Sequence, residues 1–130
     1  AYQCVIAGAA VSDPEMQVNY YRYRLRGSSK IEQLRMWDDS VSPMNEIDKI
    51  NVPILMIHGS VDQRVPVDHA EKYVKALEEA GKDYKYLELD GADHFSNTLF
   101  YDHKIVLYEA LLSYLRNECN LGPTVSTAGR

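Results

Sequence analysis

The sequence is poor in cysteine and has no long apolar run. Its 130 residues include two cysteines, Cys4 and Cys119, which lie far apart and show no metal-ligand spacing. Cys4 stands in an apolar run, so we expect it to behave as a small buried hydrophobe. Sequence alone leaves a disulfide between the two open, and with it the redox compartment. No stretch approaches the ~20 apolar residues that a membrane-spanning helix needs, so we expect a soluble protein without a membrane partner, cytoplasmic or periplasmic.

Basic residues are also too few for a nucleic-acid surface. Fourteen Lys and Arg stand against nineteen Asp and Glu, a net charge of −5, and neutralising phosphates needs clustered cations. The one basic cluster, Arg22, Arg24 and Arg26, is short and interleaved with apolar residues. The four histidines form no His-x-x-x-His pair or other tight ligand set. We therefore expect no metal site and no cofactor.

Strand-like and helical patterns alternate along the chain. Apolar runs predict strands, and apolar residues at three- and four-residue spacing predict helices. The expected strands are Gln3–Gly8, Ile54–His58 and Tyr84–Leu89, and the expected helices are Asp68–Ala80 and Asp102–Asn117, with a shorter helix opened by Ser42 and Pro43. This alternation predicts an α/β fold, a mostly parallel sheet with covering helices.

Helix ends and domain limits complete this outline. Asp68, with Glu71 three residues on, is the expected cap of the first long helix, and Gly81 its left-handed stop. Asp102 is the expected N-cap of the last helix. We expect one domain over residues 1–121 and a flexible tail over residues 122–130, which is small and polar.

Two polar clusters follow the second and third strands, where α/β sheets gather their ligands. His58–Pro66 follows one strand and Asp90–Phe95 the other. Each supplies one member of a catalytic triad, Asp62 as the acid and His94 as the base. Their order agrees with the α/β-hydrolase chain order, in which the serine comes first, the acid second and the histidine last.

These segments resemble the prolyl oligopeptidase family of serine peptidases, which includes dipeptidyl and acylaminoacyl peptidases. Pro53–Pro66 resembles its acid loop, and the helix from Asp68 followed by Gly91–Phe95 resembles its histidine loop. Ser42–Ile50 looks like the helix before the acid strand, and the resemblance covers about residues 3–118. It implies the C-terminal portion of an α/β-hydrolase fold and cleavage of short peptides without a cofactor.

Carried over by position, the resemblance assigns further residues. Asp62 matches the triad acid and His94 the base. Arg64 resembles an arginine that some members use to bind a substrate carbonyl. Val11–Tyr23 resembles the stretch that lines the pocket for the residue before the scissile bond, with Tyr20 and Tyr21 as its expected wall.

The family's nucleophile motif is missing. No glycine of the sequence begins a Gly-x-Ser-x-Gly, and the oxyanion hole that depends on this motif is missing too. We expect a fragment that starts after the nucleophile, has the missing N-terminal part of the same protein as its partner and is inactive alone.

Other interpretations stay open. His58 is expected to be a structural histidine, and His69 and His103 to be solvated near helix starts. A carboxylesterase of the same fold would use the same residues on esters. A non-enzymatic assembly module is the alternative from another class, and a homo-oligomer formed through an exposed edge of the sheet would fit it.

Overall fold

The computed structural model describes residues 2–24, 42–94 and 100–120. In chain order the elements are β1 (Val5–Gly8), α1 (Pro14–Arg24), the 3-10 helix η2 (Pro43–Lys49), β2 (Ile54–Gly59), α3 (Asp68–Glu79), β3 (Tyr84–Leu89) and α4 (Tyr101–Asn117). The expected tail, residues 122–130, lies outside the described residues. The helix over Pro14–Arg24 was not predicted.

The three strands form one parallel sheet in the order β1-β2-β3. Val5 pairs with Ile54 on one side of β2, and Ile54 pairs with Tyr84 on the other. All six residues of β2 are buried, because both of its faces are covered and both of its edges are paired. The near-continuous apolar sequence of this strand predicted that position.

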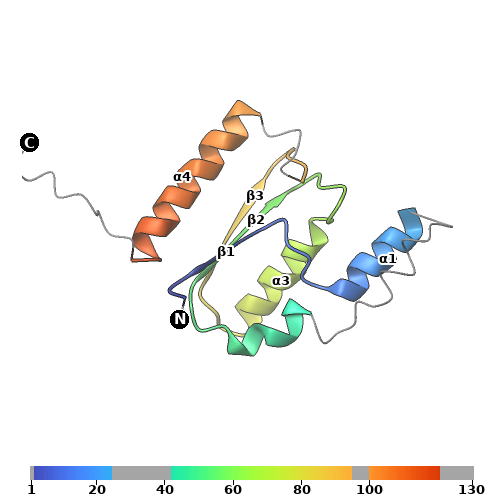
Figure 1. Cartoon of the computed structure of the whole chain (residues 1–130), viewed down its shortest axis with the longest axis horizontal. Helices are drawn as coiled ribbons and strands as arrows, with labels where there is room; N and C mark the ends of the chain where they lie inside the picture. Colours follow the sequence, from blue (N-terminus) through green and yellow to red (C-terminus); the bar gives the residue numbers. More distant parts are fainter. Residues whose placement is uncertain (1, 25–41, 95–99, 121–130) are drawn as a thin grey trace, which may run out of the picture.

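Helices cover the two faces of the sheet (Figure 1). Leu55 and Ile57 of β2 pack toward α4, in a core with Leu89 and Tyr114. Ile54 and Met56 point to the opposite face, where they meet Tyr73 and Leu77 of α3. This alternation is the two-residue period of a strand. Burial of each of these large side chains contributes about 1.5–3 kcal/mol to folding.

The helix ends differ from the expected caps in two places. Val67, not Asp68, is the N-cap of α3, and it makes no side-chain cap hydrogen bond. Phe100, not Asp102, is the N-cap of α4. Asp68 and Asp102 thus lie in the first turns of their helices, where a negative charge interacts favourably with the helix dipole. Gly81 does end α3, with φ +65°. In the part of the chain that the structure describes, no helix is long and apolar enough to cross a membrane.

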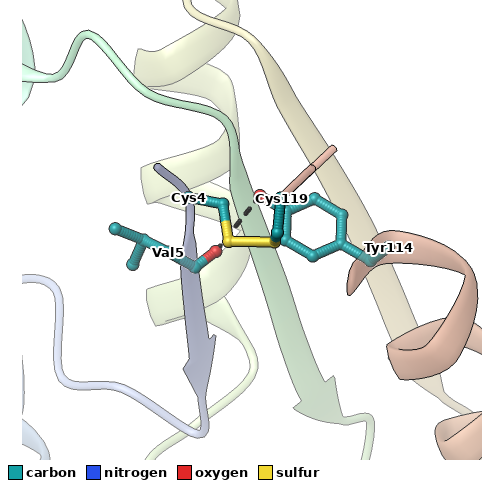
Figure 2. Close-up of a disulfide and its surroundings, with 4 residues drawn as sticks. All are labelled: Cys4, Val5, Tyr114 and Cys119. Carbon is teal, nitrogen blue, oxygen red and sulfur yellow. Dashed lines mark hydrogen bonds between the residues drawn. A yellow bond between two sulfur atoms is a disulfide. The ribbon is translucent and has the colours of Figure 1, made fainter. Parts of the chain in front are cut away.

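A disulfide joins the beginning of the described chain to the end of α4. Cys4 and Cys119 are bonded, which decides the question that the sequence left open. Beside the bond, the hydroxyl of Tyr114 donates to the carbonyl of Val5 over 3.2 Å (Figure 2). α4 is thus tied to β1, although β2 and β3 are the strands that it covers with apolar side chains.

Candidate active site

Two hydrogen-bonded loops leave the carboxyl ends of β2 and β3. We call residues 60–66 the acid loop and residues 90–94 the histidine loop. The N–H of Ser60 donates to Leu89 O over 3.1 Å, and the N–H of Val61 donates to Ala92 O over 3.1 Å. The parallel pairing of β2 and β3 therefore continues into the loops and fixes them against each other.

Asp62 is the buried centre of the acid loop. Its side chain is 0% exposed, and its Oδ1 accepts hydrogen bonds from the N–H groups of Arg64 at 2.8 Å and Val65 at 2.9 Å. An aspartate that binds backbone N–H groups two and three residues on makes its own turn. The same bonds supply donors to a carboxylate that burial would otherwise destabilise.

His94 faces the other oxygen of that carboxylate. Its Nδ1 lies 2.7 Å from Asp62 Oδ2. An ionised carboxylate only accepts, so Nδ1 carries a hydrogen, and in the neutral imidazole Nε2 then has the lone pair. The side chain of His94 is 28% exposed, which leaves the imidazole accessible. The structure thus brings together the two residues that the sequence singled out, in the orientation that a general base requires.

His58 lies near the same carboxylate oxygen and is fully buried. Its Nε2 is 2.8 Å from Val65 O and 3.5 Å from Asp62 Oδ2. The sequence predicted a structural histidine at this position, and the burial agrees. The contact with Asp62 was not predicted, because two residues four positions apart across a loop have no fixed spatial relation.

α1 packs its side chains against the acid loop. The amide of Gln17 donates to Arg64 O over 2.8 Å, and the hydroxyl of Tyr20 donates to Gln63 O over 2.8 Å. The rings of Tyr20 and Tyr21 meet edge to face, with centroids 5.6 Å apart. Tyr20 therefore lies beside the acid loop, which contains Arg64, and Tyr21 lies next to Tyr20. Their roles toward a substrate stay predictions.

His69 is buried, so the expectation that it is solvated was wrong. It is 0% exposed, its carbonyl accepts from the Ser12 hydroxyl over 2.7 Å, and its Nδ1 lies 3.4 Å from the N–H of Asp13. Burial lowers the pKa of His69 more than the charges of Asp13 and Asp68 raise it. A neutral imidazole thus joins the start of α3 to the residues just before α1.

His103 is half-buried and hydrogen-bonded at both ring nitrogens. Its Nε2 donates to Asp90 O over 2.6 Å, and its Nδ1 lies 3.3 Å from the N–H of Phe100. The side chain holds the first turn of α4 against the histidine loop. A histidine three residues after the helix N-cap is the signal that could have predicted the contact with the N–H of Phe100.

Within the described ranges, no three His, Cys, Asp or Glu side chains are grouped so that they could hold a metal ion. The chemistry that the two loops offer is that of an oriented base. An imidazole whose Nδ1–H is held by a buried carboxylate can take a proton at Nε2 from a hydroxyl and return it later.

The family model for the prolyl oligopeptidase family matches residues 1–122. The chain belongs to this family. The Arabidopsis thaliana acylamino-acid-releasing enzyme is 37% identical over 54 residues, which are 42% of this chain and 7% of that protein. Dipeptidyl-peptidase 5 of Aspergillus oryzae is 26% identical over 110 residues, 85% of this chain and 15% of that protein. The chain therefore spans a small part of these relatives' length.

Solved structures share the fold. The acylaminoacyl peptidase of Pyrococcus horikoshii superposes with a TM-score of 0.72 at 15% identity, over 95% of this chain and 21% of its own. An esterase of Thermogutta terrifontis superposes with a TM-score of 0.64 at 22% identity, over 95% of this chain and 45% of its own. At these identities the likeness concerns the fold alone. This likeness confirms the predicted α/β-hydrolase fold, and the chain forms one portion of that fold.

Proposed function

We propose that this chain supplies the acid and the base of a serine peptidase that cleaves short peptides by acyl transfer. The 2.7 Å contact between His94 Nδ1 and the buried Asp62 Oδ2 is the observation that carries the proposal. His94 takes the proton of the attacking serine at Nε2 and returns it to the leaving amine. Asp62 holds the imidazole in this tautomer and stabilises its cationic form.

The nucleophile of this proposal is a serine outside the 130 residues. No Gly-x-Ser-x-Gly occurs in the sequence, and the chain matches 7% and 15% of the length of the two relatives. The amide after that serine forms part of the oxyanion hole. The 130-residue chain alone is therefore expected to be inactive and to need the segment that carries the serine as its partner.

The substrate side of the proposal rests on α1 and the acid loop. Arg64 has an exposed side chain, while its N–H and carbonyl are bonded to Asp62 and Gln17. Its guanidinium binds a substrate carbonyl near the triad, and Tyr20 and Tyr21 line the pocket for the residue before the scissile bond. The names of the relatives, acylamino-acid-releasing enzyme and dipeptidyl-peptidase, favour short peptides over large proteins.

A carboxylesterase is the second candidate. The superposition on the Thermogutta terrifontis esterase favours it, because Asp62 and His94 would act on an ester in the same way. The family match favours the peptidase. The two candidates differ in the leaving group. In the peptidase His94 protonates a leaving amine, and in the esterase the leaving group is an alcohol.

The disulfide favours an oxidising compartment. A bond between Cys4 and Cys119 persists in the periplasm or outside the cell, whereas cytosolic thiols are kept reduced. We therefore propose that the protein works outside the cytosol.

Hydrolysis by the natural protein that contains these residues tests the proposal. Acetyl-alanyl-p-nitroanilide, alanyl-prolyl-p-nitroanilide and p-nitrophenyl acetate serve as blocked peptide, free peptide and ester. We expect an anilide to be cleaved, with kcat lower by about 10⁴-fold in Asp62→Asn and by about 10⁶-fold in His94→Ala. Asp102→Asn, which changes an exposed carboxylate in the first turn of α4, is the control and keeps its activity. Cleavage of the ester alone would support the esterase, and full activity of His94→Ala would refute both candidates.

A further inference from the structure

His58 lies close to Asp62 Oδ2, the oxygen that His94 also contacts. Its imidazole is 0% exposed, and its Nε2 is 2.8 Å from the carbonyl of Val65. A carbonyl oxygen only accepts, so Nε2 carries the hydrogen and this tautomer of His58 is fixed. The same N–H lies 3.5 Å from Asp62 Oδ2. The hydrogen is donated to Val65 O, and the carboxylate lies near the same nitrogen.

These contacts close a small ring around the acid. The N–H of Val65 donates to Asp62 Oδ1, while the carbonyl of Val65 accepts from His58. Val65 is therefore held both at its backbone N–H, by Asp62, and at its backbone carbonyl, by His58. Removing the donor of His58 would leave the carbonyl of Val65 without this hydrogen bond.

We propose that His58 is a positioning residue for the reaction, holding the turn from Asp62 to Val65 and the Oδ2 atom where Asp62 orients His94. This inference rests on the proposed function, because it assigns His58 a part in the work of Asp62 and His94. His58 touches no reacting atom in this account. It acts through the carboxylate, and its effect appears in turnover and not in substrate binding.

Other polar side chains lie close to His58. Asp62 faces it from the acid loop, and Asp62 Oδ2 is also the oxygen that His94 contacts. His69 lies on α3, and burial lowers the pKa of His69. Within the described residues, Nδ1 of His58 has no hydrogen-bond partner. The Nε2–H group is therefore the donor through which His58 acts on the turn.

Substitution of His58 by glutamine or by methionine separates the effect of its hydrogen-bond donor from the effect of its packing. The two side chains have similar length and volume, but only glutamine can place an N–H near the position of Nε2. Turnover is measured in the natural protein that contains this chain, as kcat and KM for the best p-nitroanilide, normalised to the active sites titrated with a fluorophosphonate. We expect His58→Met to lower kcat by about 10²-fold, the scale of a small misplacement of a catalytic group, with KM changed less than threefold. His58→Gln restores at least a tenth of the lost activity.

The outcomes are distinct for the two proposals. Equal losses of kcat in His58→Gln and His58→Met, or a loss that appears mainly in KM, would show a packing role and overturn this inference. So would a His58→Met enzyme as active as the wild type, provided that the wild type depends on His94. A wild type that is inactive or indifferent to His94→Ala would instead overturn the proposed function itself.

Discussion

Gly59 is the residue at which β2 gives way to the acid loop, and it lies directly against the histidine loop. A Cβ built at this position would lie 2.3 Å from Ala92 O and 2.4 Å from Asp93 O. Both atoms are backbone, so no side chain can rotate to make room. The close approach of the two loops therefore depends on the missing side chain of this glycine.

A Gly59→Ala substitution is expected to separate the loops. The overlap costs about 1–3 kcal/mol or more of stability, and it lengthens the contact between Asp62 and His94. Gly81→Ala is the matched control, because its Cβ meets nothing within 4 Å and only the left-handed φ of +65° is strained, at about 1 kcal/mol. Urea unfolding and the hydrolysis assay measure both effects. Equal stability and activity in the two variants would contradict the account of the loop contact.

The residues of the site were predictable to different degrees. Asp62 and His94 follow neighbouring strands of a parallel sheet, so their side chains meet for a reason that sequence order already contains. The contact of His58 with Asp62 depends on how the acid loop turns back. That turn comes from the bonds of Asp62 to Arg64 and Val65, which no periodicity reveals.

At the scale of elements, strands were predicted better than helix ends. Tyr84–Leu89 forms β3 as expected, because its alternating pattern suits a strand at the edge of the described sheet. α1 was missed because its apolar residues follow no clear helical period. Its start signal was present, since Asp13 accepts from the N–H of Met16 and Pro14 occupies the first helical position.

The disulfide between Cys4 and Cys119 is expected to stabilise the fold. The two cysteines are 115 residues apart, and closing so long a loop in the unfolded chain contributes about 2–5 kcal/mol. Dithiothreitol should lower the unfolding midpoint of the wild type and leave that of the Cys4→Ser/Cys119→Ser variant unchanged. Two thiols that react with Ellman's reagent in the native, unreduced protein would show that the bond does not form.

At the scale of the whole molecule, apolar side chains remain exposed on two surfaces. Val5 and Ile6 of β1 are 36% and 38% exposed, and among the described strands β1 pairs only with β2. The outer face of α4 also carries exposed Tyr108 and Leu112. A strand paired with the outer edge of β1 would reduce the exposure of Val5 and Ile6. The exposed edge therefore supports the interpretation of the chain as an assembly module.

We propose that the 130-residue chain on its own associates through β1. Sedimentation velocity at micromolar concentration should show dimers or larger species, and Ile6→Lys should restore the monomer by placing a charge at the edge strand. Tyr108→Lys is the control on the α4 surface and should leave association unchanged. A monomeric wild-type chain would refute the proposal, and dissociation by Tyr108→Lys alone would move the interface to α4.

Labelling with a fluorophosphonate, followed by mapping of the modified residue by mass spectrometry, tests the central claim most directly. The samples are the natural protein that contains this chain, its His94→Ala variant and the 130-residue chain alone. We expect one labelled serine within a Gly-x-Ser-x-Gly outside these residues, loss of labelling in His94→Ala and no labelling of the chain alone. Labelling that persists without His94, or that falls on a serine within these 130 residues, would contradict the assignment of Asp62 and His94 as acid and base.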